Sequence, residues 1–511
     1  MNKRSPIPKL DLAPKLNRPL SLWNPLDYLR LLYWVFFFPQ ALRWYVETYG
    51  GGESLPKQTT GQKKLEFLRQ HPNQLKLWIQ GLLLTVIVSF AFCGLLEQVG
   101  FEIEWSGVAL GVVIGMVFGI RPGLSMGVAW GVAWGVTWGV VQVMFWGLGF
   151  WGGGMGVAGD VAWSVAMGVS VSVGMGVAGG VGLGVVLFVG LFVGSMVLFA
   201  VLSVVLDRGL DVGWSSLVLG VAIWRPENWL IYLPPNLQTP KYNSWLFPRI
   251  TPIPLPLLEF RLKTWLRQNW LLGLQNANEL LRYSLQFIPV VKAVNQVLAE
   301  IPSEQLIFRV SQLAENPSDW KLVKFASASL TTELETQFTK GILFCAFQND
   351  SDNVTSNDSD NVPSVVEPRL DTPTRATAAG FWYLHEKKPE QATTAFFVVR
   401  SLLYGEEMFM LAQTLAQFKK AKKPDSIAAI QLPIFPSEPL LRPTTWDVVN
   451  SLRRVVEDVK IVLGGNSKSA RSFALNRAMG ELKNIIDNAD NIPKAEQDLI
   501  VEIAQTWITE L

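Results

Sequence analysis

One stretch of the chain, residues 122–206, is almost without charge, and this constrains the fold more than any other feature. Of its 85 residues, Asp160 is the only one with a formal charge. A helix needs about 20 apolar residues to cross a bilayer, so this stretch is long enough for about three crossings. Two further apolar runs precede it, at residues 77–96 and 105–120. The sequence therefore predicts a polytopic membrane protein of mainly α fold, with a transmembrane helix bundle and cytoplasmic all-helical domains.

The composition agrees with a membrane location and excludes several classes of function. Charged residues make up 17% of the 511 residues, whereas soluble domains have about a quarter. The 44 basic residues are balanced by 42 acidic ones, which excludes a strongly basic nucleic-acid-binding protein. Two cysteines and two histidines are too few for a disulfide framework or a Cys-rich zinc site. We therefore expect no enzyme: no catalytic residues, no cofactor and no metal.

The charges around the apolar runs predict the topology in the cell membrane. Residues 1–76 contain 12 Lys/Arg, which places the N-terminus in the cytoplasm by the positive-inside rule. After the runs at 77–96 and 105–120, further crossings are predicted at residues 124–149, 155–178 and 181–206. A last run, residues 212–224, either crosses, giving six spans and a cytoplasmic C-terminus, or lies in the interface, giving five. We choose six spans, because a large polar half of near-neutral charge suits the cytoplasm.

Glycine recurs at every fourth residue in the first part of the membrane block. The nine positions are Gly107, Gly111, Gly115, Gly119, Gly123, Gly127, Gly131, Gly135 and Gly139. On a helix this spacing aligns the glycines in one row, which lets a neighbouring backbone approach closely. Trp130, Trp134 and Trp138 form a parallel ridge that can fill such a groove. We interpret the row as a helix-packing surface, and a solute or ion path through the bundle is the alternative.

Asp160 is the candidate polar site inside the membrane block. An intramembrane carboxylate is a functional candidate by default, because burying a charge in lipid is costly. Three glycines at residues 152–154 lie close before it, so a turn at the membrane interface is the alternative. Patterns that match a nucleophile elbow and a dinucleotide fingerprint also occur here. They lack the strand context that such motifs require, so we attribute them to glycine density.

The N-terminal arm is predicted to form an aromatic helix that lies in the membrane interface. Its uncharged core, residues 31–42, is too short to span and contains Pro39. The predicted interfacial anchors are Trp23, Tyr28, Trp34, Trp44 and Tyr45. A core helix docked on another cytoplasmic domain is the alternative.

These patterns divide the chain into seven segments. They are a basic cytoplasmic arm (1–76), the transmembrane bundle (77–225), a helical domain (226–346), a disordered linker (347–373), an αα-hairpin (374–423), a Pro-rich connector (424–443) and a three-helix C-terminal segment (444–511). The hairpin also matches part of a tetratricopeptide-type repeat, but one hairpin does not make a stable array. In the last segment, Thr444 and Asp447 have the spacing of a capping box.

Six stretches together resemble a known group of proteins. They are Trp23-Asn-Pro25-x-Asp27-Tyr-Leu-Arg30, the Gly-Val-Ala-Trp repeats at 127–138, Trp224-Arg-Pro-Glu-Asn-Trp229, Asn276-Ala-Asn278, Gln286-Phe-Ile-Pro-Val290 and Ala470-Arg-Ser-Phe-Ala-Leu-Asn-Arg477. The chain resembles uncharacterised cyanobacterial membrane proteins with Gly-rich spans, whose longer members carry a C-terminal STAND-type P-loop ATPase. This chain ends at Leu511, where that ATPase would begin. The resemblance implies an input or anchoring region that acts with a separately encoded P-loop ATPase.

We therefore expect a multi-pass membrane anchor or sensor that presents cytoplasmic helical domains to a signalling partner. The expected partners are the lipid bilayer and either the separately encoded ATPase or another cytoplasmic protein, with no nucleic acid. The alternative function is a channel or transporter subunit for ions or small solutes, formed by the Gly/Trp-rich bundle.

Overall fold

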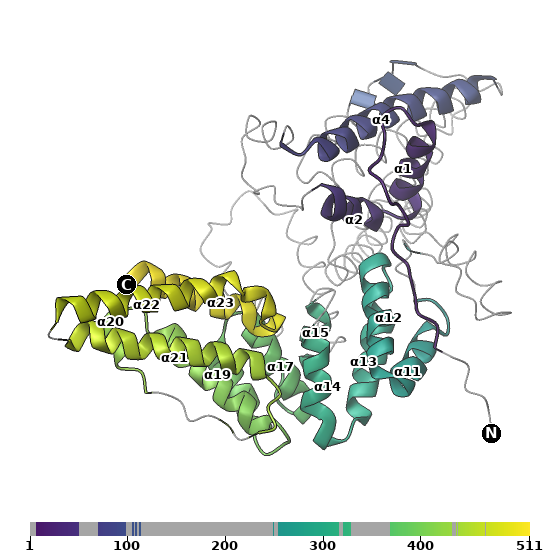
Figure 1. The fold of residues 1–511 in the computed structure, drawn as a ribbon. Helices are drawn as coiled ribbons and strands as arrows, with labels where there is room; N and C mark the ends of the chain where they lie inside the picture. Colours follow the sequence, from purple (N-terminus) through teal and green to yellow (C-terminus); the bar gives the residue numbers. More distant parts are fainter. Residues whose placement is uncertain are drawn as a thin grey trace, which may run out of the picture. The chain divides into compact units, whose positions relative to one another are not determined.

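A computed structural model describes most of the two ends of the chain (Figure 1). The described residues are 7–50, 70–98, 105–106, 108–109, 112–113, 249, 254–315, 320–328, 368–431, 436, 438–465 and 467–511. Their regular secondary structure is helical, with no strand in these ranges, which confirms the mainly α class. The nine repeat glycines, Asp160, the predicted spans from residue 124 to 224 and the linker up to residue 367 lie outside the described residues.

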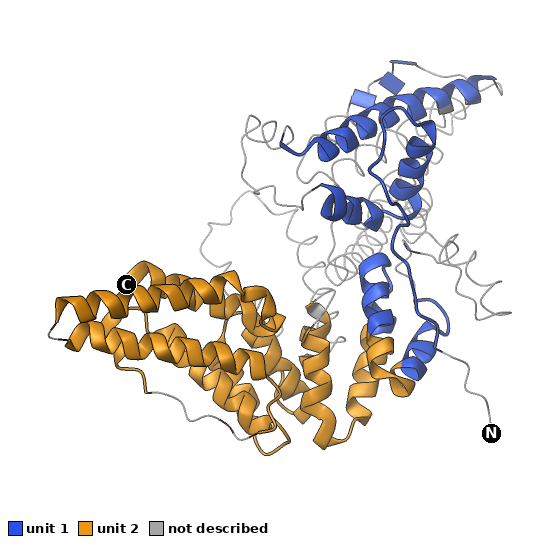
Figure 2. Cartoon of the chain, in the orientation of Figure 1, with its two compact units in different colours: residues 1–265, 275–290, 334–361 blue, residues 266–274, 291–333, 362–511 orange. Residues whose placement is uncertain are grey.

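The chain divides into two compact units, which Figure 2 colours separately. Unit 1 consists of Met1–Trp265, Gln275–Val290 and Leu334–Asn361. Unit 2 consists of Leu266–Leu274, Val291–Glu333 and Val362–Leu511.

Unit 1 contains the N-terminal arm and one long apolar helix. The arm forms α1 (Pro25–Phe37) and α2 (Gln40–Tyr49), and both contact α4 (Pro72–Gln98). Asn24 caps α1 by accepting a hydrogen bond from the Leu26 backbone nitrogen.

The arm has two helices where the sequence predicts one. The residue before a proline is driven away from the helical conformation, and α1 accordingly ends just ahead of Pro39. Two of the predicted interfacial anchors, Trp34 and Tyr45, are buried within the protein at 4% and 0% exposure. Tyr45 accepts a hydrogen bond of 3.1 Å from the Leu20 backbone nitrogen. These two aromatic side chains therefore hold the arm together, and do not anchor it in lipid.

The extended segment ahead of α1 is attached to α12 (Trp270–Tyr283) by the Asn276 amide and by the Glu279 carboxylate, which accepts from the Leu12 backbone nitrogen at 3.2 Å. The Asn276 oxygen accepts from the Leu10 backbone nitrogen at 2.9 Å, and its nitrogen donates to the Pro8 carbonyl at 2.9 Å. Asn276 is fully buried, and both bonds join residues far apart in the sequence. The Asn276 amide thus makes the same two hydrogen bonds to this extended segment, one accepted and one donated, that a backbone peptide group of an adjacent β-strand would make.

Unit 2 is an assembly of helices in which α17 and α23 each contact at least four others. It contains the end of α11 (Leu258–Gln268), the start of α12, most of α13 (Phe287–Glu300), and then α14 (Ser303–Glu315), α15 (Lys321–Ser327), α17 (Pro373–His385), α18 (Pro389–Val398), α19 (Gly405–Lys420), α20 (Pro424–Ala428), α21 (Pro443–Gly464), α22 (Lys468–Asp487), the 3₁₀ turn η2 (Ala489–Asn491) and α23 (Lys494–Glu510). Helix α17 contacts α14, α15, α18 and α23. Residues 374–423 thus contain α19 in addition to the two predicted helices, and they share one unit with residues 444–511.

Close packing inside unit 2 depends on a glycine and three aromatic side chains. A methyl group at Gly380 on α17 would lie 2.5 Å from the ring of Phe396 on α18, so this contact requires glycine. Trp507 on α23 is fully buried, packs edge-to-face on Phe418 and donates its indole N–H to the Ala421 carbonyl at 2.7 Å. The first contact joins two consecutive helices, whereas the contacts of Trp507 join segments that are distant in the sequence.

The start of α21 differs from the sequence prediction. No side chain of its own caps the helix, so the capping box expected at Thr444 and Asp447 is wrong. Glu407 on α19 takes this role, because its carboxylate accepts from the backbone nitrogens of Leu441 and Arg442 at 2.6 and 2.8 Å. The same carboxylate accepts from the Trp446 indole at 3.2 Å.

Candidate functional site

Helix α4 is the first candidate, because its length and composition suit a membrane span. The segment Pro72–Leu95 has 24 residues with a mean hydropathy of 2.0. In the part of the chain that the structure describes, it is the one helix long and apolar enough to cross a bilayer. The sequence predicts a span at residues 77–96, within this helix. Buried core helices of soluble proteins can have the same composition, so the placement of its side chains is the more informative observation.

Helix α4 differs from a soluble surface helix, because its buried face is partly polar and its exposed face is apolar. Its buried side chains include four polar ones, Gln74, Gln80, Thr85 and Ser89, beside the apolar Leu77, Leu84 and Cys93. Its large exposed side chains are apolar: Leu83 (42% exposed), Ile87 (54%), Phe90 (38%) and Leu95 (61%). A helix at a protein–water boundary buries its apolar stripe and exposes its polar one. A helix in lipid does the opposite, because its polar groups bond within the protein.

The polar face of α4 binds the N-terminal arm. Gln80 donates its side-chain N–H to the Ser21 carbonyl at 2.8 Å, and Gln74 donates to the Gly50 carbonyl at 2.6 Å. These bonds fix both ends of the arm, just before α1 and just after α2, against the first half of α4. The arm and this helix therefore form one hydrogen-bonded element.

Helix α1 also exposes an apolar face. Trp23 just before it is 93% exposed, and Leu26, Leu29 and Phe37 are 66%, 63% and 42% exposed. At 3.6 residues per turn these positions share one side of the helix. This face, with Trp23 as an amphipathic anchor, has the composition of a helix that lies in the headgroup region.

The buried carboxylate of Asp27 holds the segment that precedes α1. Asp27 is fully buried and accepts hydrogen bonds from Arg18 at 2.8 and 3.0 Å and from the Ser21 backbone nitrogen at 2.9 Å. Burial by itself would raise the pKa of Asp27, but the bonds from Arg18 and Ser21 outweigh it and hold the pKa below its ordinary value. These hydrogen bonds stabilise the ionised carboxylate and hold the segment before α1 in place.

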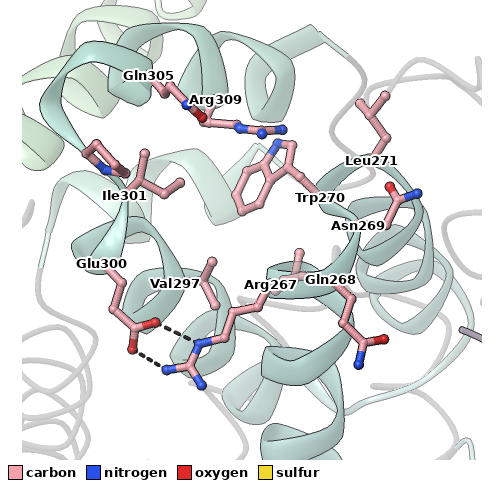
Figure 3. Close-up of a pocket in the computed structure, with 12 residues that line it drawn as sticks. Arg267, Gln268, Asn269, Trp270, Leu271, Val297, Glu300, Ile301, Gln305 and Arg309 are labelled. Carbon is pink, nitrogen blue, oxygen red and sulfur yellow. Dashed lines mark hydrogen bonds and ion pairs between the residues drawn. The ribbon is translucent and has the colours of Figure 1, made fainter. Parts of the chain in front are cut away.

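The second candidate is a pocket of 560 Å³ in unit 2, drawn in Figure 3. Its walls come from the end of α11, the first turn of α12, the end of α13 and the start of α14. On one side Arg267 and Glu300 form a two-bond ion pair, with distances of 2.7 and 2.6 Å. On the other side lie the Trp270 indole and the Arg309 guanidinium, 5.9 Å from the ring centroid. Natural ligand sites have volumes of about 300–1,000 Å³, so this pocket is of suitable size.

A cluster of buried charges lies elsewhere in unit 2 and connects several helices. Arg442 is 2% exposed and lies 3.2 Å from Glu315 on α14 and 3.3 Å from Glu496 on α23. Burial raises the pKa of Glu496, and the charge of Arg442 opposes this rise. A buried guanidinium of this kind needs its carboxylates, because an unpaired buried charge is strongly destabilising. We therefore assign the cluster to the architecture of unit 2.

The residues that the sequence marked as sites and those that the structure brings together are different sets. The glycine row and Asp160 lie outside the described residues. Trp270 and Arg309 are separated along the chain, and no local motif marks them. Among the described residues, no group of three or more His, Cys, Asp or Glu side chains is arranged to hold a metal ion.

Comparisons with known proteins add no relative. No family model, no curated protein and no solved structure matches the chain.

Proposed function

We propose that the chain is a multi-pass membrane anchor or sensor that presents cytoplasmic helical domains to a signalling partner, without catalytic activity of its own. The observation that carries the proposal is the polarity of α4, which buries glutamines together with apolar side chains and exposes leucine, isoleucine and phenylalanine. Its location is the cell membrane, with the N-terminus and the C-terminus in the cytoplasm.

The energetics favour lipid as the surroundings of this exposed face. Burying one large aliphatic or aromatic side chain away from water stabilises by about 1.5–3 kcal/mol. Four such side chains on α4 and four on or next to α1 are 38% exposed or more. Contact with lipid removes this penalty, and the Gly-rich sequence at residues 122–206, with Asp160 as its one formal charge, extends the same environment through further predicted spans.

The division of the chain into two units supports the anchoring role. Unit 1 contains the arm and α4, whereas unit 2 contains most of the other described helices. A partner such as a separately encoded P-loop ATPase would bind on the cytoplasmic side. The arm, hydrogen-bonded to the start of α4, would hold the chain at the membrane surface.

Spin labels on the full chain in nanodiscs test the lipid contact of α4. In a background with Cys93 and Cys345 replaced by alanine, a label at Ile87→Cys should collide with dissolved oxygen and be shielded from a water-soluble nickel chelate. The matched control is Phe473→Cys on α22, an exposed apolar position (68%) in unit 2, where the chelate should have access. A label at residue 87 as accessible to nickel as the control would overturn the membrane proposal.

Measurements of membrane topology and of ion transport distinguish the anchor proposal from the channel alternative. A reporter fused after Leu511 should be active in its cytoplasmic form, and activity only of a periplasmic reporter refutes the six-span topology. The full chain in proteoliposomes should pass no ions. An ion flux that disappears in Asp160→Asn would replace the anchor proposal by the channel alternative.

A further inference from the structure

The pocket of unit 2 contains two hydrogen-bond donors, on Trp270 and Arg309, that have no acceptor among the residues that the structure describes. Trp270 is 5% exposed, and its indole nitrogen is buried with no hydrogen-bond acceptor among the described residues. In Figure 3 this nitrogen faces the side of the pocket where the Arg309 guanidinium lies. A buried donor without an acceptor is unfavourable, since it has lost water and gained nothing in return.

Arg309 supplies a positive charge at the same place. Its guanidinium lies 5.9 Å from the centre of the Trp270 ring, and no described carboxylate forms an ion pair with it. The other arginine of the pocket differs in this respect, because Arg267 is bound by both oxygens of Glu300. One wall of the pocket is thus neutralised, and the opposite wall has a cation and an unpaired N–H.

From these groups we propose that the pocket is a binding site for a small organic anion, a carboxylate or phosphate attached to a flat apolar group. One oxyanion would accept from the Trp270 indole and the Arg309 guanidinium together, which is a charge-assisted arrangement. The flat group would lie against the indole and the aliphatic side chains of Val297 and Ile301, which also line the pocket. A volume of 560 Å³ accommodates a ligand of one or two rings.

This site would supply the signal of the proposed sensor, and in that role it rests on the proposed function. Binding itself is independent of membrane insertion, because all the lining residues belong to unit 2. A chain that fails the spin-label test can still bind the anion, and a membrane-inserted chain can fail to bind. The two failures are therefore distinguishable.

Calorimetric titration of the full chain, in nanodiscs of zwitterionic lipid, tests the site with benzoate, phenyl phosphate and the neutral benzamide. We expect benzoate or phenyl phosphate to bind at least about tenfold more tightly than benzamide, because a hydrogen bond to a charged group is roughly twice as strong as a neutral one. Inorganic phosphate should bind more weakly than phenyl phosphate, since it lacks the flat group. Equal binding of benzamide, or no binding of either organic anion, would overturn the proposal.

Two arginine variants provide a matched comparison within the same pocket. Arg309→Gln should weaken binding of the organic anion by about tenfold or more, whereas Arg267→Gln should change it by less than about threefold, because Glu300 already neutralises Arg267. Trp270→Phe keeps an aromatic ring, removes the N–H donor and should weaken binding by about three- to tenfold. Unchanged melting of each variant verifies that it folds. Equal losses in the two arginine variants would refute the assignment of Arg309.

A further arm identifies the source of the anion. Nanodiscs that contain phosphatidylglycerol should leave the affinity for benzoate unchanged if the ligand is a soluble molecule. Displacement of benzoate by this lipid would overturn the proposal of a soluble ligand, and would show that Trp270 and Arg309 bind a lipid headgroup.

Discussion

Replacing Glu407 by alanine removes the carboxylate that holds the start of α21. Three N–H groups donate to it, from the backbones of Leu441 and Arg442 and from the indole of Trp446, at distances of 2.6–3.2 Å. Glu407 is 4% exposed, so water cannot take its place without opening the helix packing. Alanine would leave these donors without an acceptor in the interior of unit 2.

The magnitude follows from the number of bonds. A hydrogen bond to a charged group contributes about 1.5–3 kcal/mol, so three bonds total about 4.5 kcal/mol at the lower limit. Removing the buried carboxylate also relieves its own desolvation, which offsets part of this sum. We expect a net loss of about 3 kcal/mol, which is a large fraction of the about 5–15 kcal/mol by which domains are stable.

Hydrogen–deuterium exchange of the full chain measures this loss at the helix concerned. A loss of about 3 kcal/mol increases the exchange rate of the protected amides of α21 roughly 100-fold, since each 1.4 kcal/mol is a factor of ten. The matched control is Glu406→Ala, which removes the neighbouring carboxylate, 48% exposed and paired with Arg400 on the surface. It should cost less than about 1 kcal/mol. Equal exchange of α21 in the two variants would refute the capping role of Glu407.

Three further predictions concern packing and pH. Gly380→Ala should lower the thermal stability of unit 2 by about 1–3 kcal/mol, because the new methyl group meets the Phe396 ring at 2.5 Å. Gly480→Ala, in a helix with nothing within 4 Å, should raise it by about 0.5–1 kcal/mol, and losses in both would contradict this reasoning. Burial lowers the pKa of His385 from 6.5, so the stability present above pH 6.5 should be lost as the pH falls through the folded-state pKa. His385→Asn should therefore reduce the change in melting temperature between pH 7 and 5. The pKa of Asp27 is held below 3.8, so unit 1 should lose stability as pH falls through that lowered value; a pH profile unchanged in Asp27→Asn would contradict this.

The local patterns of the sequence predict most of the described helices. Amphipathic spacing and proline or glycine breaks indicate α21, α22 and α23, since they depend only on residues within a few turns of one another. The apolar run at residues 77–96 likewise predicts α4, because a helix is the way such a run satisfies its backbone in lipid. The mainly α class follows from these local rules.

Contacts between distant residues are the part that local patterns do not contain. The sequence marks Thr444 as the cap of α21, but the packing of α19 places Glu407 there. It marks Trp34 and Tyr45 as membrane anchors, but the fold of the arm buries both. In both cases packing against other segments decides the outcome: it determines which side chain caps α21 and whether the two aromatic rings face the protein interior.

The sequence alone determines that this chain is helical and that a long uncharged block separates its two polar ends, because charge and periodicity act along the chain. The tertiary structure alone decides which polar groups of α4 are buried, which arginine of the pocket pairs with Glu300 and which carboxylate caps α21. These features depend on contacts between different segments of the chain. Close packing and the need to pair buried polar groups select these contacts, and neither condition can be evaluated from residues adjacent in the sequence.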